Sequence, residues 1–123
     1  MKKLAFKKSV FLASALFCCL ATSQIASASD KIATCKIVEQ GKTAFKGKCK
    51  FYSDKGGSFS VSNVNPDKPI VNDTMMINVY VVKPNVAEVS GLVYGHGSNW
   101  GQAIRSNKER ACWVGSDFKI CVW

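Results

Sequence analysis

The chain has 123 residues, and its 17 lysines and arginines outnumber its 8 aspartates and glutamates, which gives a formal net charge of +9. This length allows a single domain. The positive charge favours acidic partners such as polymers, surfaces or a carboxylate-lined cleft, although it also simply promotes solubility.

The first 28 residues have the three parts of a secretory signal peptide. Four lysines (Lys2, Lys3, Lys7 and Lys8) precede an uncharged apolar stretch from Ser9 to Ala21, and Ala26-Ser27-Ala28 supplies small residues for cleavage after Ala28. The apolar stretch is shorter than the roughly 20 residues that span a bilayer, so an uncleaved anchor is the less favoured alternative. We therefore expect residues 1–28 to be removed and residues 29–123 to form one periplasmic or secreted domain without a transmembrane segment.

Cleavage would change both the charge and the cysteine content. The signal peptide holds four of the basic residues, none of the acidic ones and two of the six cysteines, so the remainder has a net charge of +5 and four cysteines. An even number of cysteines in a small exported domain indicates two disulfides, here among Cys35, Cys49, Cys112 and Cys121. Of the three possible pairings we favour Cys35–Cys49 and Cys112–Cys121, because each would join the two strands of a local hairpin. Zinc is the alternative, but Cys-x-x-Cys is missing and His96 is the only histidine.

Segments of alternating polarity, rich in β-branched and aromatic residues, follow one another along residues 29–123 and predict strands. In chain order they cover 33–39, 44–53, 58–63, 74–83, 86–94, 101–106, 109–114 and 118–123. Glycine, proline and asparagine clusters predict the turns between them, including a first hairpin tip at 41–43, a glycine-rich loop at 95–99 and a turn at 116–117. We find no convincing helix. The expected fold class is all-β, a small antiparallel barrel of about eight strands with two disulfides.

The residues of known catalytic constellations do not come together in this sequence. His96 lies between two glycines, the Gly-x-Ser-x-Gly nucleophile elbow is missing, and the four cysteines of the mature chain are assigned to disulfides. The spacing of the acidic residues does not indicate the paired carboxyl groups of a glycoside hydrolase. We expect a protein that is not an enzyme, has no catalytic residues, and needs no metal, no cofactor and no nucleic-acid partner.

The segment from Val89 to Cys112 is the most informative part of the chain. It carries large amphipathic rings at Tyr94 and Trp100, with Arg105 and Lys108 nearby. Aromatic and basic side chains on a scaffolded loop are typical of binding hot spots. The alternative is structural: a strand with a bulge, both rings in the core, and a solvated basic turn.

Two motifs in this segment resemble those of the periplasmic and membrane-bound inhibitors of c-type lysozyme. Ser90-Gly91-Leu92-Val93-Tyr94 matches the Ser-Gly-x-x-Tyr motif of that family. The family's second motif is Tyr-x-x-x-Thr-Lys-Gly, to which residues 100–106 are similar, with Trp100 in place of the tyrosine and Arg105 in place of the lysine. Two other positions of the second motif depart from the family pattern.

This resemblance implies an eight-stranded antiparallel barrel that inhibits c-type lysozyme by inserting a loop into the active-site cleft. Ser90 would then hydrogen-bond a catalytic carboxylate, and Arg105 would pair with one. Lys108 is a second candidate for the basic role, because the guanidinium fork is not equivalent to an ammonium. Gly91, Tyr94 and Trp100 complete the expected lysozyme-binding site, with Tyr94 orienting the loop.

A function of another class depends on the lysines near the first predicted hairpin. Lys46, Lys48 and Lys50 alternate along one predicted strand and would share one face, with Lys42 close by. Such a row fits an exported binding module for an acidic polymer or the envelope surface. A solvated strand face is its ordinary structural explanation.

Overall fold

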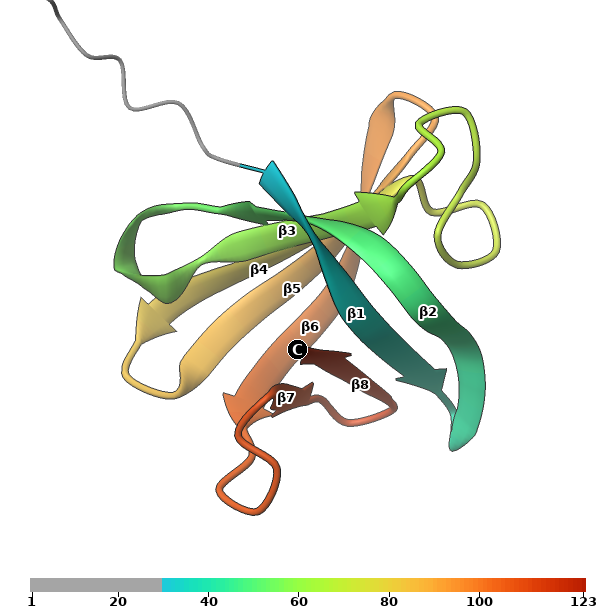
Figure 1. The fold of residues 1–123 in the computed structure, drawn as a ribbon. Coiled ribbons are helices and arrows are strands. Elements are labelled where there is room, and N and C mark those ends of the chain that lie inside the picture. Colours follow the sequence, from blue (N-terminus) through green and yellow to red (C-terminus); the bar gives the residue numbers. More distant parts are fainter. Residues whose placement is uncertain (1–29) are drawn as a thin grey trace, which may run out of the picture.

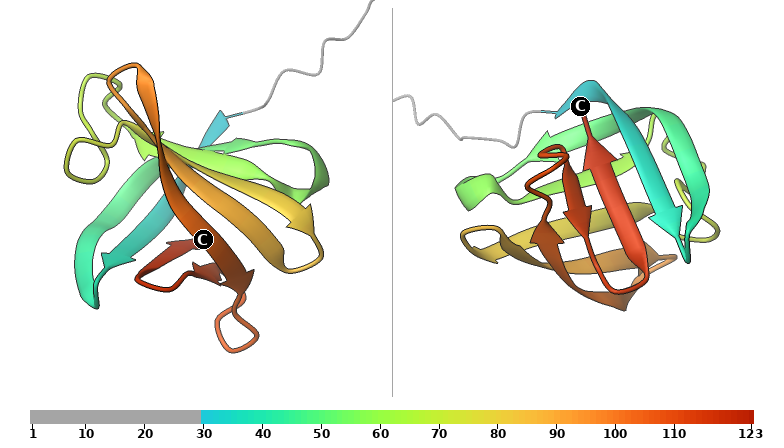
Figure 2. Two further views of the ribbon diagram at one scale, coloured as in Figure 1. Left: turned by 180° about the vertical axis from the view of Figure 1, so that it is seen from behind. Right: turned by 90° about the horizontal axis from the view of Figure 1, so that it is seen from below.

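Residues 30–123 are described by the structure, a computed structural model of the chain, and the predicted signal peptide lies outside the described residues. This part of the chain contains β1 (Asp30–Glu39), β2 (Lys42–Ser53), a short 3-10 helix η1 (Lys55–Gly57), β3 (Phe59–Asn63), β4 (Met76–Lys83), β5 (Val86–Val93), β6 (His96–Arg105), β7 (Cys112–Val114) and β8 (Phe118–Val122). Each strand pairs antiparallel with the next, and β8 pairs with β1, so the sheet closes into an eight-stranded barrel (Figures 1 and 2). The predicted fold class is therefore confirmed. Between residues 30 and 123, no helix has the length and apolar character needed to cross a membrane.

The barrel interior is formed by alternate residues of the strands, as a period of two requires. Ile37 on β1, Val61 on β3, Ile77 on β4 and Ile120 on β8 are completely buried there. The residues between them in sequence point outward, so each strand has one apolar face and one face toward solvent. Aromatic side chains complete the core, including a stacked pair between Phe51 and Phe59.

Two disulfides, Cys35–Cys49 and Cys112–Cys121, link β1 to β2 and β7 to β8, which confirms the predicted pairing. All four cysteines are buried. Cys112 and Cys121 are directly opposite each other, as the predicted turn at 116–117 requires. The predicted hairpin tip at 41–43 would likewise place Cys35 directly opposite Cys49. This register is wrong, because Cys35 is opposite Gly47 and the first bridge therefore runs diagonally between the strands.

The difference at the first hairpin has a local cause. Its turn is Gln40-Gly41, both with positive φ, instead of the predicted 41–43, and a register shift follows at Ile37/Val38. Two positive φ values are typical of the two-residue turns whose twist matches that of paired strands. The predicted strands at 74–83 and 109–114 also begin too early, because β4 starts at Met76 and β7 only at Cys112.

Loss of the Cys112–Cys121 bridge should destabilise the barrel. The bridge joins residues 9 apart and anchors a strand of 3 residues. In the chain-entropy view a loop of this size contributes about 2–3 kcal/mol. Guanidinium unfolding of the double variant Cys112→Ala/Cys121→Ala should show that loss. The matched variant Cys35→Ala/Cys49→Ala should lose a similar amount. An unchanged midpoint in either variant would contradict a structural role for its bridge.

Candidate functional site

The β5–β6 hairpin contains the Ser90–Tyr94 motif and ends in a tight turn instead of the glycine-rich loop predicted at 95–99. Tyr94 and Gly95 are the turn residues, both with positive φ, and Val93 pairs directly with His96. The predicted loop is therefore wrong, since β6 begins at His96. A tyrosine at the first position of such a turn is unusual, which is why the local sequence did not reveal it. The hairpin projects from the barrel beside the irregular segment 64–75 (Figure 2).

Gly91 and Trp100, one from each motif, meet inside this hairpin. A Cβ atom on Gly91 would lie 2.9 Å from Thr74 Cγ2 and 2.9 Å from Trp100 Nε1. The indole of Trp100 packs against the core and meets Phe118 edge-on, with ring centroids 5.5 Å apart. Trp100 therefore anchors the hairpin to the core, and the missing side chain of Gly91 leaves room for the indole. Tyr94 is different, because its side chain is 69% exposed at the tip.

Ser90 lies on the outer face of the barrel in a row of uncharged polar side chains. Its cross-strand neighbours are Asn78 on β4 and Asn99 on β6, where a bulge after Val89 resets the register. Neighbouring strands are about 4.8 Å apart, so these three side chains form a short ladder at that spacing. We name Asn78, Ser90 and Asn99 the donor row.

The hydrogen bonds that the donor row makes within the protein involve the oxygens of its two asparagines as acceptors. Asn78 Oδ1 accepts a bond of 2.6 Å from Ser60 Oγ, and Asn99 Oδ1 accepts one of 3.0 Å from the Gly101 amide. Each asparagine oxygen therefore already accepts one bond, and within residues 30–123 no hydrogen bond is found from the side-chain N–H groups of either asparagine. The Ser90 hydroxyl can also donate. Such a surface suits acceptors, above all carboxylates, which form stronger hydrogen bonds than neutral oxygens do.

Arg105 and Lys108 lie at the opposite end of β6 from the hairpin tip. Arg105 follows the buried Ala103 on the inner face; its guanidinium carbon is 5.6 Å from the Trp113 ring centroid, and its Nε donates to the Arg110 carbonyl at 2.8 Å. Lys108 is in the β6–β7 loop, where Ser106 Oγ accepts bonds from the Lys108 and Glu109 amides. The structure thus brings together Ser90, Gly91, Tyr94 and Trp100 and leaves both basic candidates apart from them.

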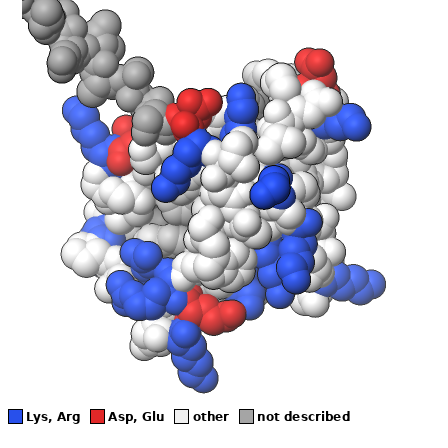
Figure 3. All heavy atoms as spheres, in the orientation of Figure 1, with Lys and Arg blue, Asp and Glu red and all other residues white. Residues whose placement is uncertain are grey.

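The outer face of β1 and β2 is a second polar surface and is basic. Lys46, Lys48 and Lys50 point outward from β2 as their spacing predicted, and Lys36 on β1 is directly opposite Lys46. Figure 3 shows basic side chains over this face of the molecule and also beyond it. Only Lys50 of this set has an acidic partner among residues 30–123, with Asp30 Oδ2 at 3.9 Å. We name Lys36, Lys46 and Lys48 the lysine face.

Sequence reasoning identified Ser90 but missed Asn78 and Asn99. Neither asparagine belongs to a motif, and both are placed beside Ser90 only by the cross-strand register. Comparison of the chain with protein families, with curated proteins and with solved structures finds no match. The functional interpretation therefore depends on the residues themselves.

Replacement of Gly91 by alanine should destabilise the hairpin. The added methyl group would push against Thr74 and Trp100, at a cost of about 1–3 kcal/mol in the free energy of unfolding. Gly97 is the matched control in the same hairpin, because a Cβ atom at that position would have its nearest neighbour 4.0 Å away. Urea unfolding should separate Gly91→Ala from a nearly unaffected Gly97→Ala. Equal stability of the two variants would show that the packing around Gly91 is not restrictive.

Proposed function

We propose that this protein is an exported inhibitor of c-type lysozyme that presents the donor row to the catalytic carboxylates. The support from the sequence is the Ser-Gly-x-x-Tyr match and the approximate second motif. The support from the structure is that a closed eight-stranded antiparallel barrel is the fold this resemblance implies, and that Gly91 and Trp100 of the two motifs are in contact.

The observation that carries the proposal is the donor character of Asn78, Ser90 and Asn99. Both asparagine oxygens already accept a hydrogen bond within the protein, so the row can present N–H and O–H groups to a partner. The two carboxyl groups of a retaining glycosidase are about 5–5.5 Å apart. Strands are about 4.8 Å apart, so two adjacent members of the row can each donate to one carboxylate.

Neutral donors also have an energetic advantage in such a cleft. They lose less hydration than an ammonium or guanidinium group on burial, while their bonds to a carboxylate are still charge-assisted. Tyr94 and Leu92, both exposed on the same hairpin, supply apolar contact area beside the row. Arg105, which the resemblance implies as the basic contact, is not required in this arrangement, since it lies over Trp113 at the other end of β6.

Residues 29–123, purified with both disulfides formed, should slow the lysis of a cell-wall suspension by c-type lysozyme. Ser90→Ala should weaken inhibition about tenfold, as expected for the loss of one charge-assisted hydrogen bond. Asn99→Asp should weaken it more, because a carboxylate would then face carboxylates. This change keeps an oxygen for the Gly101 amide, so the turn geometry should be preserved.

The control for this series is Asn107→Asp, which makes the same charge change on an exposed residue of the β6–β7 loop. It should inhibit as well as the unmodified protein. Unchanged lysis at micromolar protein would refute the proposal. Equal loss in Asn99→Asp and Asn107→Asp would show that net charge matters and the donor row does not.

The lysine face favours a second candidate function, an exported binding module for an acidic polymer. Like charges directly across two strands are destabilising, and Lys36 opposite Lys46 is such a pair. An anionic polymer bound along β1 and β2 would relieve that repulsion and release its counterions, so its affinity would fall steeply with salt.

Binding of poly-L-glutamate, measured by fluorescence anisotropy at several salt concentrations, tests this second function. The double variant Lys46→Gln/Lys48→Gln should bind more weakly and show a shallower dependence of affinity on salt. Lys83→Gln/Lys108→Gln has the same net charge and changes residues away from the lysine face. Identical binding by the two double variants would mean that general charge, and not this face, attracts the polymer.

A further inference from the structure

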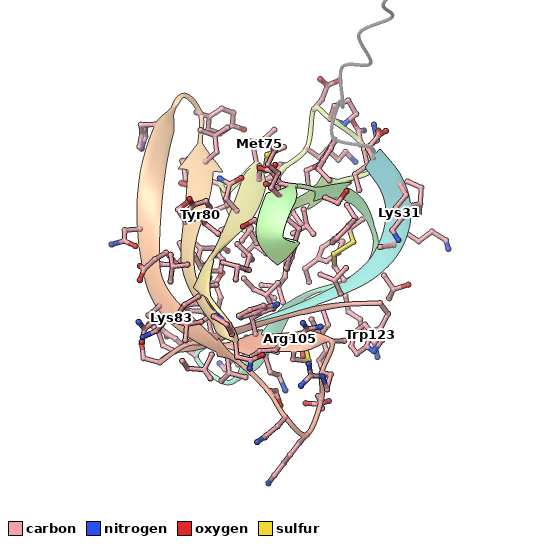
Figure 4. All side chains as sticks on the ribbon, turned by 90° about the vertical axis from the view of Figure 1, so that its left-hand side faces the viewer. Lys31, Met75, Tyr80, Lys83, Arg105 and Trp123 are labelled. Atoms are coloured by element: carbon pink, nitrogen blue, oxygen red, sulfur yellow. A yellow bond between two sulfur atoms is a disulfide. The ribbon has the colours of Figure 1, made fainter. Side chains whose placement is uncertain are left out.

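The mouth of the barrel opposite the hairpin tip contains a cavity that neither function above uses. Its volume is about 330 Å³, and its walls include Phe51, Phe59 and Trp113 on three different strands. Trp123 is at the rim, and Figure 4 shows Lys31, Arg105 and Trp123 around this opening. The cavity is at the small end of the size range of ligand sites, about 300–1,000 Å³.

Two cationic side chains occupy the inward-facing register of their strands, in which the buried residues are apolar. Lys31 continues the inward-facing series of Ala33, Cys35 and Ile37 on β1, and Arg105 continues that of Ala103 on β6. Lys31 is exposed and Arg105 is half-buried, so both cations lie at the mouth of the barrel and not in its closed interior. Both line the cavity, with Lys31 Nζ 5.4 Å from the Phe51 ring centroid and Arg105 Cζ 5.6 Å from that of Trp113.

These cations are not neutralised by acidic side chains. No aspartate or glutamate lines the cavity, and the two ion pairs found in residues 30–123 are Lys50–Asp30 and Lys119–Glu109. Arg105 uses Nε for the Arg110 carbonyl, which fixes the plane of the guanidinium group. An apolar cavity with two unneutralised cations at its rim is complementary to a molecule with an apolar body and one negative end.

We propose that this cavity binds a small amphipathic carboxylate. The carboxylate would lie between Lys31 and Arg105, and its apolar body would pack on Phe51, Phe59 and Trp113. The volume admits one fused ring system or one acyl chain of medium length and is too small for a lipid with two long chains. Two sources share this chemistry, aromatic acids and fatty acids, and indole-3-propionate and decanoate represent them.

Titration of the disulfide-bonded protein with each acid, followed by amide and indole N–H chemical shifts, tests the site. We expect saturable shifts at residues of the cavity wall for at least one acid, and the acid that binds identifies the source. Indole-3-propionamide and decanamide, which lack the charge, should bind at least about tenfold more weakly than the corresponding acids. The absence of saturable shifts with both acids would overturn the proposal, as would equal binding of the acids and amides.

Variants separate ligand binding from a purely structural role of the cations. Lys31→Gln and Arg105→Gln should each weaken binding of the acid about tenfold and leave binding of the amide unchanged. Lys68→Gln, at an exposed position in the segment 64–75 at the opposite end of the barrel, is the control with the same loss of charge. Lys31 is exposed, so its variant should fold even if Arg105→Gln does not. Unaltered affinity of Lys31→Gln and Arg105→Gln for the acid would overturn the assignment of the site.

Discussion

The barrel depends on the pairing of β1 with β8, because this pairing joins the first strand to the last and leaves no open edge. The contact is short, running from Cys35 opposite Val122 to Glu39 opposite Phe118. Both disulfides lie next to it, one linking β1 to β2 and the other linking β7 to β8. A domain of this size buries too little surface for its core alone to give high stability. The two disulfides add stability in the strands that flank the β1–β8 contact.

Closure also separates the surfaces that can interact with other molecules. The strand period places Ser90 outside and Ala103 and Arg105 inside, so residues 15 positions apart along one hairpin face different environments. The donor row, the lysine face and the mouth cavity therefore belong to different parts of the barrel. Each can be altered by substitutions that do not touch the other two.

Local sequence patterns predicted the elements of the fold better than their register. The cysteine spacing and the turn at 116–117 were sufficient to predict Cys112 opposite Cys121. At Cys35 the same reasoning predicted the bridge but missed its diagonal geometry, because the Gln40-Gly41 turn changes the pairing. The prediction of the candidate site was less complete than that of the fold. Asn78 and Asn99 lie beside Ser90 only because of long-range strand pairing and a bulge, and no local motif indicates either. Arg105 was assigned from a motif, and its position against Trp113 depends on the whole barrel.

We propose that the outer face of β4, β5 and β6 engages the catalytic cleft of c-type lysozyme. Amide chemical shifts of the isotope-labelled protein during titration with c-type lysozyme test it most directly. We expect shifts concentrated around Asn78, Ser90 and Asn99 that disappear when a cell-wall oligosaccharide already fills the cleft. Shifts confined to the lysine face, or shifts unaffected by the oligosaccharide, would contradict it.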